Sequence, residues 1–387
     1  MMAKLQKKTI ILISSIIMLF FLYGILVGHY NFFPFEIISD IKNSIIPQSE
    51  SSIRKQIHQD FSEINNLISF ENTNDILTKK EMLIKYIWFD DSLPSTLPVN
   101  HTTNISDELS NLKNLDRIDS FTVEMDYGMN SISYLFLANN SNNKLMIYHQ
   151  GDDSQSSGSF DNHSFEEDRK IIQHFLNANY SVLIFSMVGH GMNNEPIVKL
   201  DNLGDIRLNS HEHFVLLETE KFKPIKFFLE PVIITLNQID IDYSFDSYDM
   251  IGKNEGGWST IVISALDDRI KNSYAVASSF PLWMSPNAKN FGGYEHHLPP
   301  LYQIANYLEL YIMSAYGNER SLTLFYNEFD PCCFSGDLYQ KYPFADVVNP
   351  KLKSLDSGEF NVFIDNNQTE NIVSDSTLEI INKLLLN

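Results

Sequence analysis

Cysteine and basic residues are scarce in this chain of 387 residues. Two cysteines are too few for a disulfide framework, a cysteine-rich zinc module or an iron–sulfur ferredoxin. Lys and Arg number 28 against 49 Asp and Glu, which gives a net charge of −21. Such a chain repels phosphates and has no basic stripe to bind them. We therefore expect no nucleic-acid partner.

Apolar residues, by contrast, are plentiful enough for a large core. They make up 43% of the chain, and aromatic residues 12%, which excludes global disorder. The longest apolar stretch covers residues 9–28, contains no charged residue and follows several lysines within residues 1–8. A helix formed by residues 9–28 would be about 30 Å long, which is the thickness of the hydrocarbon core of a bilayer. The stretch therefore predicts a transmembrane helix.

We predict that residues 9–28 remain as an anchor rather than being removed as a signal peptide. The apolar region of a signal peptide is usually about 7–15 residues long and ends in small residues. Here bulky aromatic residues follow, among them Tyr30, Phe32 and Phe33. Positive charge before the stretch predicts that residues 1–8 stay in the cytoplasm. The protein would then be a single-pass membrane protein whose remainder lies in the periplasm or outside the cell.

The rest of the chain divides at residue 119. Residues 29–118 are polar with short helical patterns, and we interpret them as a stalk and a packing extension. Residues 119–387 alternate strand and helix patterns, which predicts an α/β domain with a mainly parallel sheet flanked by helices. The clearest predicted strands are 121–126, 131–138, 144–148, 181–187 and 248–252, and the clearest helices are 165–178, 222–238 with a kink at Pro231, 256–266 and 301–315.

One segment carries chemistry. Residues 248–258 have the pattern of a strand, a Gly-x-Asn-x-Gly turn and the start of a helix. A strand that turns sharply into a helix brings two backbones together and strains the residue at the apex, which here is Asn254. Gly252 and Gly256 suit this close approach. The apex side chain then stands exposed at the amino end of the helix, and the serine version of this turn is the nucleophile elbow.

These residues resemble the α/β-hydrolase family, and most of all its bacterial dienelactone-hydrolase-like esterases. The resemblance covers about residues 119–387 and part of the stretch 84–98. It implies that His149, Gln150 and Gly151, which follow a predicted strand, lie where the family forms half of its oxyanion hole and binds substrate. It also implies that Glu255, directly after the apex, contributes its backbone N–H on that side.

The resemblance also locates the catalytic positions, and two of the three are substituted. Asp330 ends a predicted strand where the family carries its acid. Asn254 occupies the position of the serine nucleophile, and Asn371 occupies the position of the histidine. The last histidine of the chain, His297, precedes Asp330, so no base follows the acid in the usual order of serine, acid and histidine.

Both substitutions remove groups that the reaction needs. An amide has no ionisable proton and is a poor nucleophile. Loss of a triad typically lowers the rate by about 10⁶, although binding and the oxyanion hole retain ~10³–10⁴ over water. Each substitution needs only one base change, in a chain with 37 asparagines. The sequence therefore predicts a degenerate hydrolase that binds a small-molecule or protein ligand.

An alternative hypothesis keeps the chain an enzyme. An ester or amide hydrolase with a rearranged site would use Glu255 or Cys332 as its nucleophile. Its base would be His149, His190 or one of the pair His296–His297. One of these histidines within hydrogen-bond reach of Asp330 or Cys332 would favour this alternative.

Neither a metal nor another cofactor is predicted. His211 with His213, and His296 with His297, have the composition of metal ligands. No spacing such as His-Glu-x-x-His supports a zinc site within either pair. A further hypothesis is a partner-binding module that uses residues 29–118.

Overall fold

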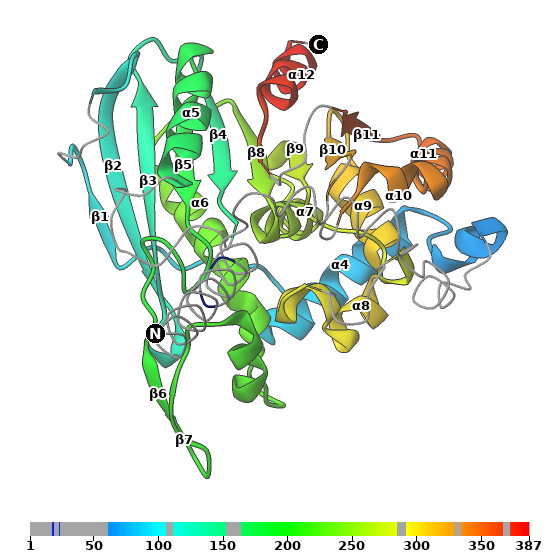
Figure 1. The fold of residues 1–387 in the computed structure, drawn as a ribbon, viewed down its shortest axis with the longest axis horizontal. Coiled ribbons are helices and arrows are strands. Elements are labelled where there is room, and N and C mark those ends of the chain that lie inside the picture. The colour runs from blue at the N-terminus through cyan, green and yellow to red at the C-terminus, as the bar shows by residue number, and fades with distance from the viewer. Residues whose placement is uncertain are drawn as a thin grey trace, which may run out of the picture. The chain divides into compact units, whose positions relative to one another are not determined.

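A nine-stranded sheet forms the centre of the described part of the chain, as Figure 1 shows for a computed structural model of the protein. The structure describes Met18, Tyr23 and residues 61–105, 111–151, 164–284, 292–328, 330, 334–366 and 372–386. The sheet order is β1-β2-β3-β5-β4-β8-β9-β10-β11. Its strands are β1 (Asn100–Thr102), β2 (Leu115–Glu124), β3 (Asn130–Ala138), β4 (Lys144–His149), β5 (Ser181–Phe185), β8 (Ser247–Lys253), β9 (Ile270–Val276), β10 (Ser321–Asn327) and β11 (Glu359–Asp365). A separate hairpin joins β6 (Ile197–Leu200) to β7 (Gly204–Arg207).

Most neighbouring strands of this sheet run parallel. From β5 through β4, β8, β9 and β10 to β11 every pairing is parallel, whereas β1, β2, β3 and β5 pair antiparallel with one another in turn. β5 is buried along its whole length, and β4 along all but its first residue. Strands covered on both faces carry unbroken apolar sequences, which is what both segments show. The predicted α/β class with a mainly parallel sheet is confirmed.

Helices cover both faces of the sheet (Figure 1). Alternate residues of β4 point into two separate cores, because successive side chains of a strand face opposite sides. Leu145 and Ile147 join the larger core, and Met146 and Tyr148 join the smaller. The larger core contains side chains of α6 (Glu230–Asp242), α7 (Glu255–Leu266) and α9 (Tyr307–Ala315), and the smaller contains those of α5 (Ser164–Asn177) and α12 (Asp375–Leu385).

Two predicted helices are each divided in the structure. In place of a helix over 222–238, the 3-10 helix η6 (Pro224–Phe228) precedes α6, and Pro231 lies in the first turn of α6 rather than at a kink. Proline suits that turn because its missing N–H has no helical partner there. In place of a helix over 301–315, α8 (Pro299–Ile304) is followed by α9, which Asn306 starts with a capping box. The remaining described α-helices are α4 (Thr73–Trp88), α10 (Gly336–Lys341) and α11 (Ala345–Ser354).

Residues from Gln59 onward form one compact unit that includes the sheet. The apolar side of α4 buries Ile76, Leu83 and Ile87 in the larger core. β1 and the first residues of β2 extend the sheet before residue 119, so the start that the sequence suggests for the domain lies within β2. Part of the segment predicted as a packing extension therefore belongs to the same core as the strands.

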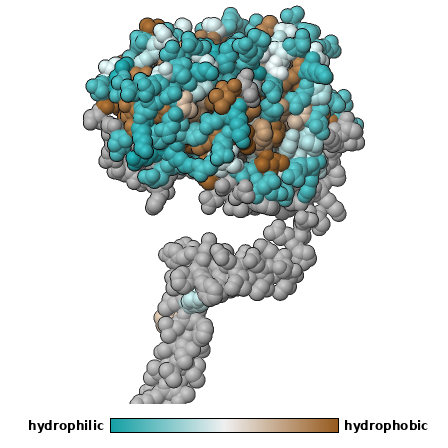
Figure 2. All heavy atoms as spheres, turned by 90° about the horizontal axis from the view of Figure 1, so that it is seen from above, coloured by the Kyte–Doolittle hydropathy of each residue, from teal (hydrophilic) through white to brown (hydrophobic). Residues whose placement is uncertain are grey.

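The described ranges contain no helix long and apolar enough to cross a membrane. The predicted anchor, residues 9–28, lies outside these ranges apart from Met18 and Tyr23. The face of the body seen in Figure 2 is mostly hydrophilic, with apolar patches between the polar side chains. Such a surface suits a chain with a net charge of −21.

Glu309 of α9 contacts Ser69 and Lys79 of the segment before the sheet, and its removal should lower the free energy of unfolding. Its Oε1 accepts hydrogen bonds from the backbone N–H and the hydroxyl of Ser69 at 2.9 and 2.7 Å, and Lys79 Nζ lies 2.6 Å from its Oε2. Removing one partner of a buried ion pair typically costs about 3–5 kcal/mol. We expect a loss of this size for Glu309→Ala, measured by urea denaturation. Glu379→Ala on the exposed side of α12 is the control, and an equal effect would contradict the assignment.

Candidate functional site

The turn between β8 and α7 has the backbone geometry of a nucleophile elbow. Asn254 at its apex has φ 50° and ψ −124°, a conformation that residues other than glycine rarely adopt. Its N–H donates to the carbonyl of Val276 at 3.0 Å, and its carbonyl accepts from the N–H of Trp258 at 3.1 Å. The strained apex is therefore held by β9 on one side and by the first turn of α7 on the other.

Three glycines make this turn sterically feasible. A Cβ on Gly252 would lie closer than 3.0 Å to the carbonyl oxygen of Gly256, and a Cβ on Gly256 equally close to the carbonyl of His149. A Cβ on Gly257 would lie 2.5 Å from the Cβ of Ser278. The backbone of α7 thus touches the ends of β8 and β4, which is the close approach predicted for Gly252 and Gly256.

The Asn254 side chain has an unused acceptor. Its Oδ1 is buried and has no hydrogen-bond partner among the described residues. Leaving such a group unsatisfied typically costs about 1–3 kcal/mol, so a donor that reached it would bind favourably. The amide can both donate and accept, which suits recognition of a carbonyl or hydroxyl group.

The residues after β4 are held by the protein itself. The Gln150 side chain donates to Asp168 and accepts from the Ser186 hydroxyl, and its backbone N–H donates to the Phe185 carbonyl at 2.9 Å. His149 Nδ1 lies 3.0 Å from the Gln150 carbonyl, and Gly151 is buried behind them. The side chains of His149 and Gln150 therefore have structural contacts, and their predicted part in binding substrate stays a prediction.

Burial is the main influence on the pKa values of His149 and Asp168. Removal from water lowers the pKa of His149 to about 4, against the effect of its contact with the Gln150 carbonyl. Burial raises the pKa of Asp168 to about 6, although Lys253 and the hydrogen bond from Tyr148 favour its charged form. His149 is consequently a neutral ring at pH 7.

Asp330 lies just beyond β10, at the position expected for the acid. It is buried, and its Oδ2 accepts from the Phe334 N–H at 3.0 Å. Asn371 and Cys332 lie outside the described residues.

Glu167 connects the segment before α12 to the elbow. Its carboxylate accepts from the N–H of Val373 at 2.8 Å and pairs at 2.5 Å with Lys253, the residue before the apex.

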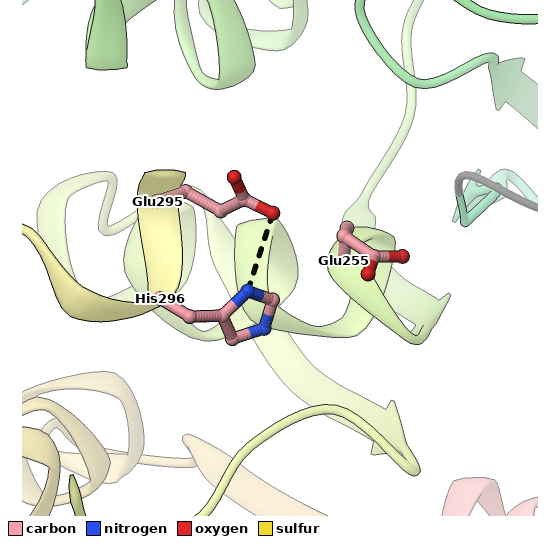
Figure 3. Close-up of side chains that lie close together, drawn as sticks. All are labelled: Glu255, Glu295 and His296. Carbon is pink, nitrogen blue, oxygen red and sulfur yellow. Dashed lines mark ion pairs between the residues drawn. The ribbon is translucent and has the colours of Figure 1, made fainter. Parts of the chain in front are cut away.

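A cluster of two histidines and two glutamates lies beside the apex, and the alternative hypothesis anticipated only its pairing of Glu255 with His296. Glu295 and His296 belong to the 3-10 helix η8 (Tyr294–His297), and His211 begins η5 (His211–Leu217). Glu295 Oε1 lies 3.2 Å from Nδ1 of His296 and 3.3 Å from Nδ1 of His211. Glu255, the first residue of α7, completes this His–Glu cluster, and Figure 3 shows it across from Glu295 and His296.

Tyrosines hold the cluster against the elbow helix. Tyr302 donates its hydroxyl to the Glu295 carbonyl at 2.7 Å and accepts from the Trp258 indole N–H at 2.8 Å. Tyr307 donates to the His296 carbonyl at 3.0 Å. Trp258, one turn into α7, thereby connects η8 to the helix that starts at the apex.

The charges of the cluster depend on one another. Burial disfavours the charged form of Glu295, yet His211 and His296 hold its pKa well below the usual range. Burial likewise disfavours protonation of the two histidines, but Glu295 raises the pKa of His211 to about 9 and also raises the pKa of His296. Without another cation, a protonated histidine balances the buried carboxylate at neutral pH.

Sequence reasoning considered each histidine pair by itself and so missed that His211 and Glu295 belong to this cluster. His211 and His296 come from different pairs and meet only in the folded chain. The detectable signal was an acidic residue beside each pair, Glu212 and Glu295, and the sequence does not say which of the two is buried.

Comparison with known proteins identifies the fold. No family model matches the sequence, and no curated protein matches it either. A methylesterase matches at TM-score 0.55 and 11% identity over 86% of this chain and 67% of its own. Acetyl xylan esterase 1 from Thermoanaerobacterium matches at 0.53 and 10%, over 85% and 98%, and the acetyl xylan esterase from Paenibacillus sp. R4 at 0.51 and 12%, over 85% and 99%. The chain has an esterase-like α/β-hydrolase fold, and identities this low show the fold alone.

A side chain at Gly256 should destabilise the protein more than a side chain at a glycine that only has a positive φ. We expect Gly256→Ala to lower the free energy of unfolding by about 3 kcal/mol or more, because its Cβ would overlap the His149 carbonyl. Gly204→Ala is the control: Gly204 has φ +87° with no atom within 4 Å, so only a left-handed strain of about 1–2 kcal/mol applies. Equal losses in urea denaturation would refute the steric explanation.

His149 should make the protein less stable in acid. The unfolded chain binds a proton at this histidine below pH 6.5, whereas the folded chain binds one only near pH 4. Stability from His149 is therefore full above pH 6.5 and falls by about 3 kcal/mol as the pH drops to 4. Asp168 acts in the opposite direction, so the measurement is the difference between wild type and His149→Gln across this range. A difference that does not vary with pH would contradict the prediction.

Proposed function

We propose that this protein is a degenerate α/β-hydrolase that binds a ligand at its elbow without turning it over. The observation that carries the proposal is Asn254, an amide held in the strained apex conformation with its Oδ1 buried and unpaired among the described residues. The turn keeps the geometry of a nucleophile, and an amide in that place can form hydrogen bonds but cannot attack a carbonyl.

The ligand would be a neutral compound that carries a hydroxyl group, with or without a carbonyl such as that of an ester. A donor on the ligand satisfies Asn254 Oδ1, and the amide nitrogen in turn donates to a carbonyl or hydroxyl oxygen. Esters are the first class to test, because the structural neighbours are by name a methylesterase and acetyl xylan esterases. A protein ligand that offers a polar side chain or backbone group to the same turn is the other class.

The proposal includes a place in the cell. Residues 9–28 would anchor the chain in a membrane with residues 1–8 in the cytoplasm, and the hydrolase-like body would then face the periplasm or the exterior. The support is the uncharged apolar stretch and the lysines before it. A bound ligand would accordingly be met outside the cytoplasm.

The alternative is an active hydrolase with a rearranged site. It is favoured by Glu255, a carboxylate directly after the apex whose ligand atom lies within 4.8 Å of those of Glu295 and His296. Enzymes do use a carboxylate as a nucleophile or base when a second group activates it. Glu255→Gln would abolish turnover if this alternative holds.

Restoring the triad tests the proposal directly. We expect wild type to hydrolyse a panel of acetyl esters, methyl esters, lactones and amides no faster than background. Asn254→Ser/Asn371→His should hydrolyse at least one of them by orders of magnitude faster, since a complete triad contributes about 10⁶ in rate. Asn254→Ser alone and Asn371→His alone are the controls, and each should recover little because the triad acts as a unit.

Two outcomes would decide against the proposal. Turnover by wild type that Glu255→Gln removes would establish the rearranged hydrolase instead. A folded double variant that hydrolyses nothing on the panel would show that the pocket no longer presents an ester to the apex.

A further inference from the structure

We propose that Glu295, His296 and Glu255 form a binding site for one divalent transition-metal ion of the Zn²⁺ type, with His211 beside Glu295. The site is independent of the proposed function, because it holds whether or not the elbow turns over a substrate. Its ligands come from η8 and from the start of α7, and the neighbouring His211 begins η5.

The first argument concerns the protons on the two rings. His211 Nε2 lies 3.2 Å from the carbonyl of Val188, and His296 Nε2 lies 3.1 Å from the carbonyl of Ser278. A carbonyl oxygen only accepts, so each Nε2 carries a hydrogen. In a neutral ring the Nδ1 atom then has a bare lone pair. A histidine that donates its other N–H to a carbonyl is the usual arrangement around a protein-bound metal.

The second argument concerns the atom that lies next to these two Nδ1 atoms. Both Nδ1 atoms lie beside the same oxygen, Oε1 of Glu295, at 3.2 and 3.3 Å. For His296 the contact is an ion pair whose alignment does not make a hydrogen bond, so Nδ1 has no hydrogen-bond partner among the described residues. Acceptors that crowd together in a buried place need a shared cation or added protons between them.

Glu295 supplies an independent observation. The residue is completely buried, and its Oε2 has no hydrogen-bond partner among the described residues. A carboxylate oxygen in that state is costly unless something positive reaches it. An ion bound by both oxygens of Glu295 would satisfy Oε2 and the misaligned Nδ1 of His296 together.

The spacing fits a small ion with short bonds. Zinc binds nitrogen and oxygen ligands at about 2.0–2.2 Å in a tetrahedron, which places neighbouring ligand atoms roughly 3.3 Å apart. The distance of 3.2 Å between His296 Nδ1 and Glu295 Oε1 matches that value. Glu255 offers a further oxygen within 4.8 Å of the ligand atoms of Glu295 and His296, and it is half-buried where the others are buried. It would complete the coordination from the side of the apex.

The ligand types select the class of ion. An imidazole nitrogen with carboxylate oxygens suits zinc and the neighbouring transition metals. Calcium and magnesium take oxygen ligands almost alone, so a histidine ligand disfavours them. No ligand in the cluster is a thiolate, which makes a soft-metal site such as one for Cu(I) a poor match.

The test is a direct measurement of metal binding. The full-length protein, freed of any affinity tag and stripped with EDTA, is titrated with ZnCl₂ by calorimetry, and its zinc content after dialysis is measured by mass spectrometry. We expect one zinc ion per chain. Glu295→Gln should weaken the affinity by more than about 100-fold, since even an outer-shell partner typically contributes 10–100-fold. Glu212→Gln is the matched control, an exposed residue of η5 that should leave the affinity unchanged.

A second measurement covers the case in which Glu295→Gln does not fold. CoCl₂ added to stripped wild type should give the intense visible bands of a four-coordinate nitrogen–oxygen site rather than the weak spectrum of the hydrated ion. Failure of wild type to retain zinc, or a hydrated-ion spectrum with cobalt, would mean that protons occupy the cluster and would overturn the proposal. Zinc binding of equal strength in wild type and a folded Glu295→Gln would place the ion elsewhere and overturn it as well.

Discussion

The close approach of the α7 backbone to the ends of β8 and β4 is the constraint on which the site depends. Gly252, Gly256 and Gly257 leave no room for a side chain at three successive contacts. Any residue other than glycine at the apex is therefore strained, because main-chain hydrogen bonds from β9 and α7 hold the apex in place. The geometry is set by backbone and glycine, so the chemistry of the apex side chain can be lost while the turn persists.

The two neighbours of the apex residue, Lys253 and Glu255, contact different sets of polar residues. Lys253 before it is buried and pairs with Glu167, which also receives the N–H of Val373 from the segment before α12. Glu255 after it faces the His–Glu cluster of η5 and η8. Charges in such dry surroundings persist only when they are matched. Charged residues of both signs therefore lie on either side of the turn between β8 and α7, although Asn254 at the apex is uncharged.

Local features of the sequence predicted much of this fold. The strands of the parallel sheet were recognisable because burial on both faces demands continuous apolar residues, as in β4 and β5. The roles of Gly252 and Gly256 followed from backbone sterics alone. Pro231 and Asn306 were misjudged because each sits inside a continuous apolar pattern, and whether such a residue kinks a helix or begins one depends on where the chain turns to pack.

The sequence by itself determined the α/β class, the position of the strand-to-helix turn and the presence of Asn254 where a nucleophile would stand. Each of these depends on neighbouring residues and on the period of the apolar pattern. Only the tertiary structure decided which polar residues share a buried space. His211 and Glu295 are far apart along the chain, yet their side chains lie 3.3 Å apart. No local pattern encodes that contact, because it arises where η5 and η8 pack against each other.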